Sequence, residues 1–102
     1  MRYEIKTTNI YDEWFVTIKD KTNRARILKR QKNIQLGNFG KRESVGANLF
    51  ELKFYFGPGF RVYFTIKGDF VVFLLCGGDK STQEKDIDKA KMIQNALEES
   101  QS

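Results

Sequence analysis

The sequence predicts a single α+β domain in which helices pack against an antiparallel sheet, in the order strand, two helices, four strands, helix. Apolar residues recur every three or four positions near both ends of the chain, whereas they alternate with polar residues in the middle. The length of 102 residues suits one domain with one core. Residues 1–102 are therefore expected to form one domain.

The first part of the chain is predicted to form a short strand and a helix. Residues 2–6 alternate between polar and apolar types, as they do in a strand with one buried face. Apolar residues then recur at helical spacing from Ile10 to Ile18. Thr7 or Thr8 precedes them, and either can cap the helix.

A second helix completes an N-terminal helical hairpin. Asp20 or Thr22 can cap this helix, and Gly37 is expected to end it because glycine readily takes the left-handed backbone that terminates helices. The residues expected to face inward are Ala25, Ile27, Leu28 and Ile34.

Positive charge is concentrated in residues 19–42, which hold nine basic residues and one acidic residue. Arg26, Lys29 and Arg30 lie at helical spacing and are expected to share an outer face of the second helix. Such a segment suits nucleic acid or an acidic protein as a partner. A solvated helix face explains the same pattern equally well, and both interpretations stay open.

Four strands are expected next. A short strand lies within residues 40–46, and two alternating strands lie in residues 49–56 and 60–67. One face of the alternating pair is apolar, and the reverse face carries lysine, arginine and two tyrosines. Residues 70–76 are apolar throughout, which is typical of a central strand that is covered on both faces.

The connection Gly57-Pro58-Gly59 indicates a tight turn between the two alternating strands. The pairs expected across it are Phe56 with Phe60, Tyr55 with Arg61, and Lys53 with Tyr63. Cations and aromatic hydroxyls that share a sheet face can bind a polyanion. The pattern alone favours a different interpretation, a solvated face with charge pairs such as Glu51 with Lys53.

The last part of the chain is predicted to be a turn and a helix. Gly77-Gly78 is expected to form a turn that aims Lys80, although it lacks the spacing of known phosphate-binding glycine motifs. Ser81 and Glu84 have the spacing of a capping box. The apolar stripe of the helix consists of Ile87, Ala90, Ile93 and Leu97.

Composition excludes several kinds of chemistry. The chain has no histidine and a single cysteine, Cys76, so a zinc site and a histidine-activated nucleophile are excluded. No metal and no cofactor are expected, and Cys76 is expected to be a buried structural thiol. Neither a secretory signal nor an apolar run long enough to span a bilayer is found, so we expect a cytoplasmic protein.

Three segments together resemble a known family: RILKRQKNIQLGNFG, LFELKFYFGPGFRVYF and VVFLLCGGDKSTQEKDIDKAK. They are similar to the small toxins of the RelE/HigB/ParE superfamily of bacterial type II toxin–antitoxin systems, and most of all to the HigB-like addiction module killer branch. The likeness extends over nearly the whole chain. It implies a RelE-like fold and a cognate antitoxin, typically a small helix-turn-helix protein.

The resemblance also implies an mRNA endonuclease that acts on the ribosome without a metal. In such enzymes the 2′-hydroxyl of the substrate attacks the neighbouring phosphate and leaves a 2′,3′-cyclic phosphate. Arg61 matches the clamp on the cleaved phosphate, and Tyr55 or Tyr63 would orient the ribose or assist proton transfer. The residues that the resemblance implies as catalytic are Arg61, Lys80, Lys53, Tyr63 and Tyr55, and those expected to contact RNA or the ribosome are Arg26, Lys29, Arg30 and Gln83.

The sequence departs from the family pattern in two places. It has no histidine where several HigB-like enzymes carry one near the end of the site, and Asp79 stands where many relatives have a cation. Two alternatives therefore remain. One is a ParE-like toxin, which shares the fold but inhibits DNA gyrase without cutting RNA, and the other is an inactive prophage remnant.

Overall fold

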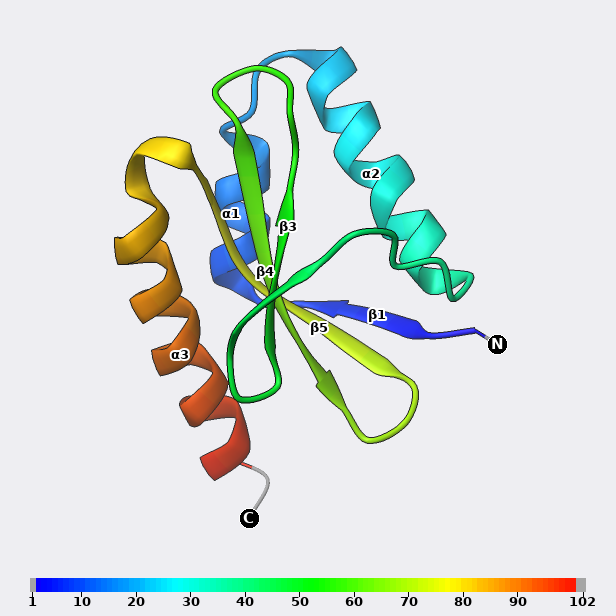
Figure 1. Cartoon of the computed structure of the whole chain (residues 1–102), viewed down its shortest axis with the longest axis vertical. Coiled ribbons are helices and arrows are strands. Elements are labelled where there is room, and N and C mark those ends of the chain that lie inside the picture. Colours follow the sequence, from blue (N-terminus) through cyan, green and yellow to red (C-terminus); the bar gives the residue numbers. More distant parts are fainter. Residues whose placement is uncertain (1, 101–102) are drawn as a thin grey trace.

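The computed structural model describes residues 2–100 and has the expected order of elements (Figure 1). No helix in this range is long and apolar enough to cross a membrane. A short 3₁₀ turn, η1, precedes the last helix. The elements are β1 (Glu4–Thr7), α1 (Asn9–Val16), α2 (Lys21–Gln35), β2 (Glu43–Gly46), β3 (Leu49–Lys53), β4 (Phe60–Lys67), β5 (Val71–Asp79), η1 (Lys80–Thr82) and α3 (Gln83–Glu99).

The five strands form one sheet in the order β1-β5-β4-β3-β2. Neighbouring strands run antiparallel with one exception, since β1 pairs with β5 in parallel. The expectation of a purely antiparallel sheet is therefore wrong at this edge. Parallel pairing needs a long connection, and here both N-terminal helices and three strands separate the two partners along the chain.

Helices cover both faces of the sheet, so the fold has three layers (Figure 1). The larger core lies between the sheet and the two N-terminal helices, and the smaller core lies between the sheet and α3. Buried residues of the larger core are Tyr11, Ile18, Ile27, Ile34, Phe39, Leu52, Phe54, Phe60, Val62, Phe64, Val72 and Leu74. Those of the smaller core are Leu49, Tyr63, Leu75, Cys76 and Ala90.

Strand β5 is covered on both faces, as its apolar sequence predicts. A β-bulge interrupts its pairing with β4, because Tyr63 pairs with Cys76 but Phe64 pairs with Leu74. Leu75 is the extra residue. Leu74 lies in the larger core and Leu75 in the smaller one, and both are completely buried.

The predicted register of the β3–β4 hairpin is wrong by two residues. Lys53 pairs with Arg61 rather than with Tyr63, and the amide of Phe54 donates to the carbonyl of Phe60 at 2.9 Å. The chain leaves the ladder after Phe54, so residues 55–59 form a longer loop than the glycine-proline-glycine motif predicts. A shift by an even number of residues keeps every side chain on its predicted face.

Two of the predicted helix caps are present, and one is not. Thr8 accepts a bond from the amide of Tyr11 at 3.0 Å, and Asp20 accepts bonds from the first turn of α2 at 2.8 and 3.1 Å. The expected capping box of Ser81 and Glu84 is wrong. Asp79 caps η1 instead, and α3 begins one turn later without a side-chain cap.

Three further local predictions need correction. Gly77-Gly78 is not a turn, since both residues lie in β5. Trp14 and Asp86 occupy the space that side chains would need at these positions. In α2, Ala25 and Leu28 are exposed rather than inward-facing. The buried residues through which this helix packs against the core are Ile27 and Ile34.

Candidate functional site

The ends of three neighbouring strands bring the predicted cations together. Lys53 on β3 is paired with Arg61 on β4, which is paired with Gly78 on β5. Gly59 lies close to both Lys80 and Arg61, because a Cβ at Gly59 would lie 3.4 Å from the Lys80 Cβ and 3.8 Å from Arg61 Nη1. The term cation row denotes these three residues, Lys53, Arg61 and Lys80.

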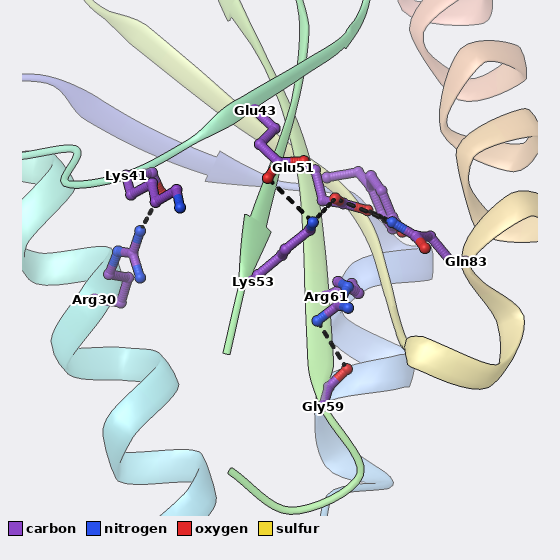
Figure 2. A network of polar contacts seen from close by, with 9 residues as sticks. Arg30, Lys41, Glu43, Glu51, Lys53, Gly59, Arg61 and Gln83 are labelled. Carbon is purple, nitrogen blue, oxygen red and sulfur yellow. Dashed lines mark hydrogen bonds and ion pairs between the residues drawn. The ribbon is translucent and has the colours of Figure 1, made fainter. Parts of the chain in front are cut away.

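Arg61 is a buried cation with few partners (Figure 2). The residue is 7% exposed, and the one hydrogen bond that its side chain makes within residues 2–100 is long, from Nη1 to the carbonyl of Gly59 at 3.4 Å. Its Nε has no partner in the part of the chain that the structure describes. Both ion pairs found among residues 2–100 belong to Lys53 and leave Arg61 uncompensated.

Behind the cation row, Glu51 holds the site together. This carboxylate is 1% exposed and accepts from the Tyr63 hydroxyl at 2.9 Å and from Gln83 Nε2 at 2.9 and 3.2 Å. It also lies 4.0 Å from Lys53 Nζ, which forms a closer pair with Glu43 at 3.1 Å. Glu51 thus connects the start of α3 to the sheet and helps to orient Lys53 (Figure 2).

Tyr63 lies at the bottom of this network, out of contact with solvent. Burial raises the pKa of Tyr63, and the hydrogen bond to Glu51 raises it further, so the hydroxyl stays protonated and donates. The interpretation of this sheet face as solvated is wrong, because α3 covers it. Any effect of Tyr63 on a bound ligand must therefore pass through Glu51.

The basic residues of α2 lie on the far side of the site. Arg30 donates from Nη2 to the carbonyl of Lys41 at 2.6 Å and to that of Phe39 at 3.4 Å, and burial lowers its pKa. Arg26 lies over the ring of Phe56 at 5.0 Å. Lys29 is exposed. The loop after β3 thus anchors Arg26, and the loop between α2 and β2 anchors Arg30, while Lys29 faces solvent.

A cavity of about 240 Å³ opens between α2 and the cation row. Tyr55 stands at its rim with 80% of its surface exposed. Lys53 belongs to both the cavity and the cation row. The lining residues are Arg30, Gly40, Lys41, Arg42, Glu43, Glu51, Lys53 and Tyr55.

Of the residues in the site, sequence reasoning missed Glu43 and gave Glu51 only a surface role. A signal for Glu51 was present, since it lies on the same face as Tyr63 opposite a helix with an apolar stripe. Gln83, expected to contact RNA, donates to Glu51, and its contact with RNA stays a prediction. Among residues 2–100, no group of three or more histidine, cysteine or acidic side chains could hold a metal ion.

Comparison with known proteins identifies the family. The model of the family "Phage derived protein Gp49-like (DUF891)" matches residues 13–98. An uncharacterized protein of Haemophilus influenzae is 45% identical over 97 residues, which cover 95% of this chain and 98% of the relative.

A solved structure shows the same fold. It is a mutant of the E. coli toxin RelE in the free state, with a TM-score of 0.69 and 14% sequence identity, and the match covers 88% of this chain and 94% of RelE. The expected RelE-like fold is confirmed. The chain belongs to the phage-derived Gp49-like (DUF891) family, a RelE/HigB-type toxin family.

Proposed function

We propose that this protein is a cytoplasmic mRNA endonuclease that acts on the ribosome and is held inactive by a cognate antitoxin. The observation that carries the proposal is the largely buried Arg61, which has no ion-pair partner among residues 2–100, beside Lys53 and Lys80. A largely buried cation without a negative partner destabilises the fold, so Arg61 suits a ligand that supplies the missing negative charge. An RNA phosphate does so.

The cation row suits the transition state of RNA cleavage by the 2′-hydroxyl. In that step a bond forms from the 2′-oxygen to phosphorus while the bond from phosphorus to the 5′-oxygen breaks, and one proton leaves the first oxygen as another reaches the second. The phosphate gains negative charge as the step proceeds. A planar guanidinium binds two phosphate oxygens at once, and Lys53 and Lys80 add further positive charge.

Proton transfer must use groups other than histidine, which the chain lacks. Tyr55 is exposed and can reach a ligand, whereas Tyr63 cannot. We assign Tyr55, the two lysines of the cation row and water as the groups available for proton transfer, with Tyr63 as a support for Glu51. No metal or cofactor takes part in the proposed step.

Contact with the ribosome is assigned to the basic face of α2. Lys29 is exposed there, and Arg26 and Arg30 are anchored beside it. Contacts with RNA phosphates release counterions, so binding should weaken steeply as salt rises. Gln83 would affect RNA binding through its bond to Glu51.

The proposal is tested by inducing the protein and mapping new 5′ ends on cellular mRNA. Arg61→Ala should abolish these ends, and Arg61→Lys should restore few of them because lysine lacks the planar pair of donors. Arg2→Ala is the matched control, since Arg2 is exposed and lies outside the site. Far-ultraviolet circular dichroism shows whether each variant folds.

Two other results would overturn the proposal. Growth arrest with intact mRNA and blocked DNA supercoiling would identify a gyrase inhibitor of the ParE type. No growth arrest by the wild-type protein would indicate an inactive remnant.

A further inference from the structure

Apart from Lys53 and Tyr55, the residues that line the cavity beside Lys53 have no part in the cleavage step. Its volume of about 240 Å³ lies below the range of roughly 300–1,000 Å³ that is usual for drug-sized ligands. It therefore has room for one small flat group rather than for a length of chain. Figure 2 shows Arg30 and Lys41 on one side of this region and Lys53 on the other.

The walls of the cavity are fixed by contacts within the protein. Backbone carbonyls of Phe39 and Lys41 hold Arg30, and Glu43 holds Lys53. Such walls need little rearrangement to receive a ligand, which lowers the entropic cost of binding. Tyr55 differs, because its ring is 80% exposed at the rim and is free to cover a bound group.

The lining of the cavity is mixed in charge. Four of the lining residues are basic, and the accessible carboxylate of Glu43 stands among them and would repel an anion. A ligand with both hydrogen-bond donors and acceptors on its edge, and with a flat face for an aromatic ring, fits the lining better. Nucleobases of single-stranded RNA have these properties, and proteins read them by stacking and by contacts to their edges.

We propose that this cavity binds the nucleobase next to the cleaved phosphate and that Glu43 selects guanine there. The inference rests on the proposed function. Lys53 lines the cavity and lies opposite Arg61, and directly paired residues on neighbouring strands have Cβ atoms about 5 Å apart. The base in the cavity would therefore belong to a nucleotide that adjoins the phosphate on Arg61.

Selection follows from the chemistry of a carboxylate. Glu43 uses Oε1 to bind Lys53, and its side chain is 44% exposed, so it can accept further bonds. Guanine presents two neighbouring N–H donors on its edge, which match the two carboxylate oxygens. Uracil presents one N–H between two carbonyl oxygens, and a carboxylate repels both carbonyls.

Nucleosides, which lack phosphate, test the cavity directly. Guanosine and uridine are titrated into the ¹⁵N-labelled protein, and the amide shifts of residues 40–43 and 53–55 are followed by NMR. Guanosine should bind about tenfold more tightly than uridine, as expected for a well-formed pair of edge contacts. Glu43→Ala should remove this difference, and Glu13→Ala, an exposed glutamate on α1, should keep it. Shifts that are absent, or equal for both nucleosides, would overturn the inference.

Cleavage maps separate base selection from a role of Glu43 in holding Lys53. Loss of the Glu43–Lys53 pair alone would lower cutting at all sites in proportion. Loss of base selection would change the frequency of guanine beside the cuts, and this is the expected result for Glu43→Ala. Unchanged preference would refute the inference and leave the proposed function intact, whereas no cuts by the wild-type protein would refute both.

Discussion

Removal of the Tyr63 hydroxyl measures what the buried network contributes to the fold. Tyr63→Phe leaves the ring in the smaller core and deletes only the 2.9 Å hydrogen bond to the Glu51 carboxylate. A hydrogen bond to a charged group contributes about 1.5–3 kcal/mol. We therefore expect the free energy of unfolding to fall by about 2 kcal/mol.

Tyr11→Phe is the matched control. Tyr11 is also buried, at 2% exposure, but its hydroxyl donates to the neutral side chain of Gln31 at 2.6 Å. A bond to a neutral acceptor contributes about 1 kcal/mol, so this variant should be about half as costly. Burial raises the pKa of both tyrosines, so both hydroxyls remain donors at neutral pH.

Urea unfolding followed by circular dichroism provides the assay. With a slope of about 1.5 kcal/mol per M, the midpoint should fall by about 1.3 M for Tyr63→Phe and by about half as much for Tyr11→Phe. Gln83→Ala and the double variant complete a cycle, and the two substitutions should be non-additive because both act on Glu51. Equal midpoints for the two tyrosine variants, together with additive effects in the cycle, would refute the assignment of Glu51 as the centre of the network.

Three further predictions concern stability and reactivity. Gly78→Ala should lower the free energy of unfolding, measured in urea melts, by about 1–3 kcal/mol or more, because a Cβ there overlaps the Asp86 carboxylate. Gly46→Ala is the control and should cost less, because the nearest neighbours of a Cβ at Gly46 are 3.4 Å away. Asp20→Ala removes the cap of α2 and should cost about 1 kcal/mol in the same assay, while a cost below about 0.3 kcal/mol would show that the cap is dispensable. Burial, and secondarily the charge of Asp86, raises the pKa of Cys76 to about 12, so the thiol stays protonated below that pH. Iodoacetamide at pH 8 should therefore label Cys76 only as fast as the protein unfolds.

Two of the central strands could be predicted from the sequence with correct bounds or nearly so. The alternation in residues 60–67 matches β4, and the apolar run that follows matches most of β5. The register of the hairpin could not be predicted, because the rings of Phe54, Phe56 and Phe60 pack edge to face and draw the loop away from the ladder. Such contacts depend on geometry that a turn motif does not encode.

The cations of the site were predicted from the sequence, but the burial of Tyr63 and Glu51 behind them was not. Arg61, Lys53 and Lys80 come together as expected from the resemblance, although their roles stay predictions. The polar face was expected either to bind RNA or to face water, and neither expectation allowed for a helix over Tyr63. The stripe of α3 contained that information, since an apolar stripe must pack on some face and the larger core is already covered by α1 and α2.

The glycines of β5 illustrate a second limit. A glycine pair after an apolar run predicts a turn because glycine is common in turns. Here the pair continues the strand, since the ring of Trp14 and the carboxylate of Asp86 approach the backbone more closely than any side chain would allow. The glycines themselves do not show whether they lie in a turn or in a closely packed strand. Only the residue that packs against them distinguishes the two structures.

The parallel pairing of β1 with β5 has a consequence for the synthesis of this protein. Among residues 2–100, β1 pairs with β5 alone, and its pairing partner lies 67 residues later in the case of Glu4 with Val71. While β5 is still inside the exit tunnel of the translating ribosome, β1 has no strand to pair with, and the sheet stays incomplete. Contacts so distant in sequence also slow folding after release. A newly made chain therefore completes its cation row, which needs Lys80 after β5, only once residues 71–80 have left the tunnel.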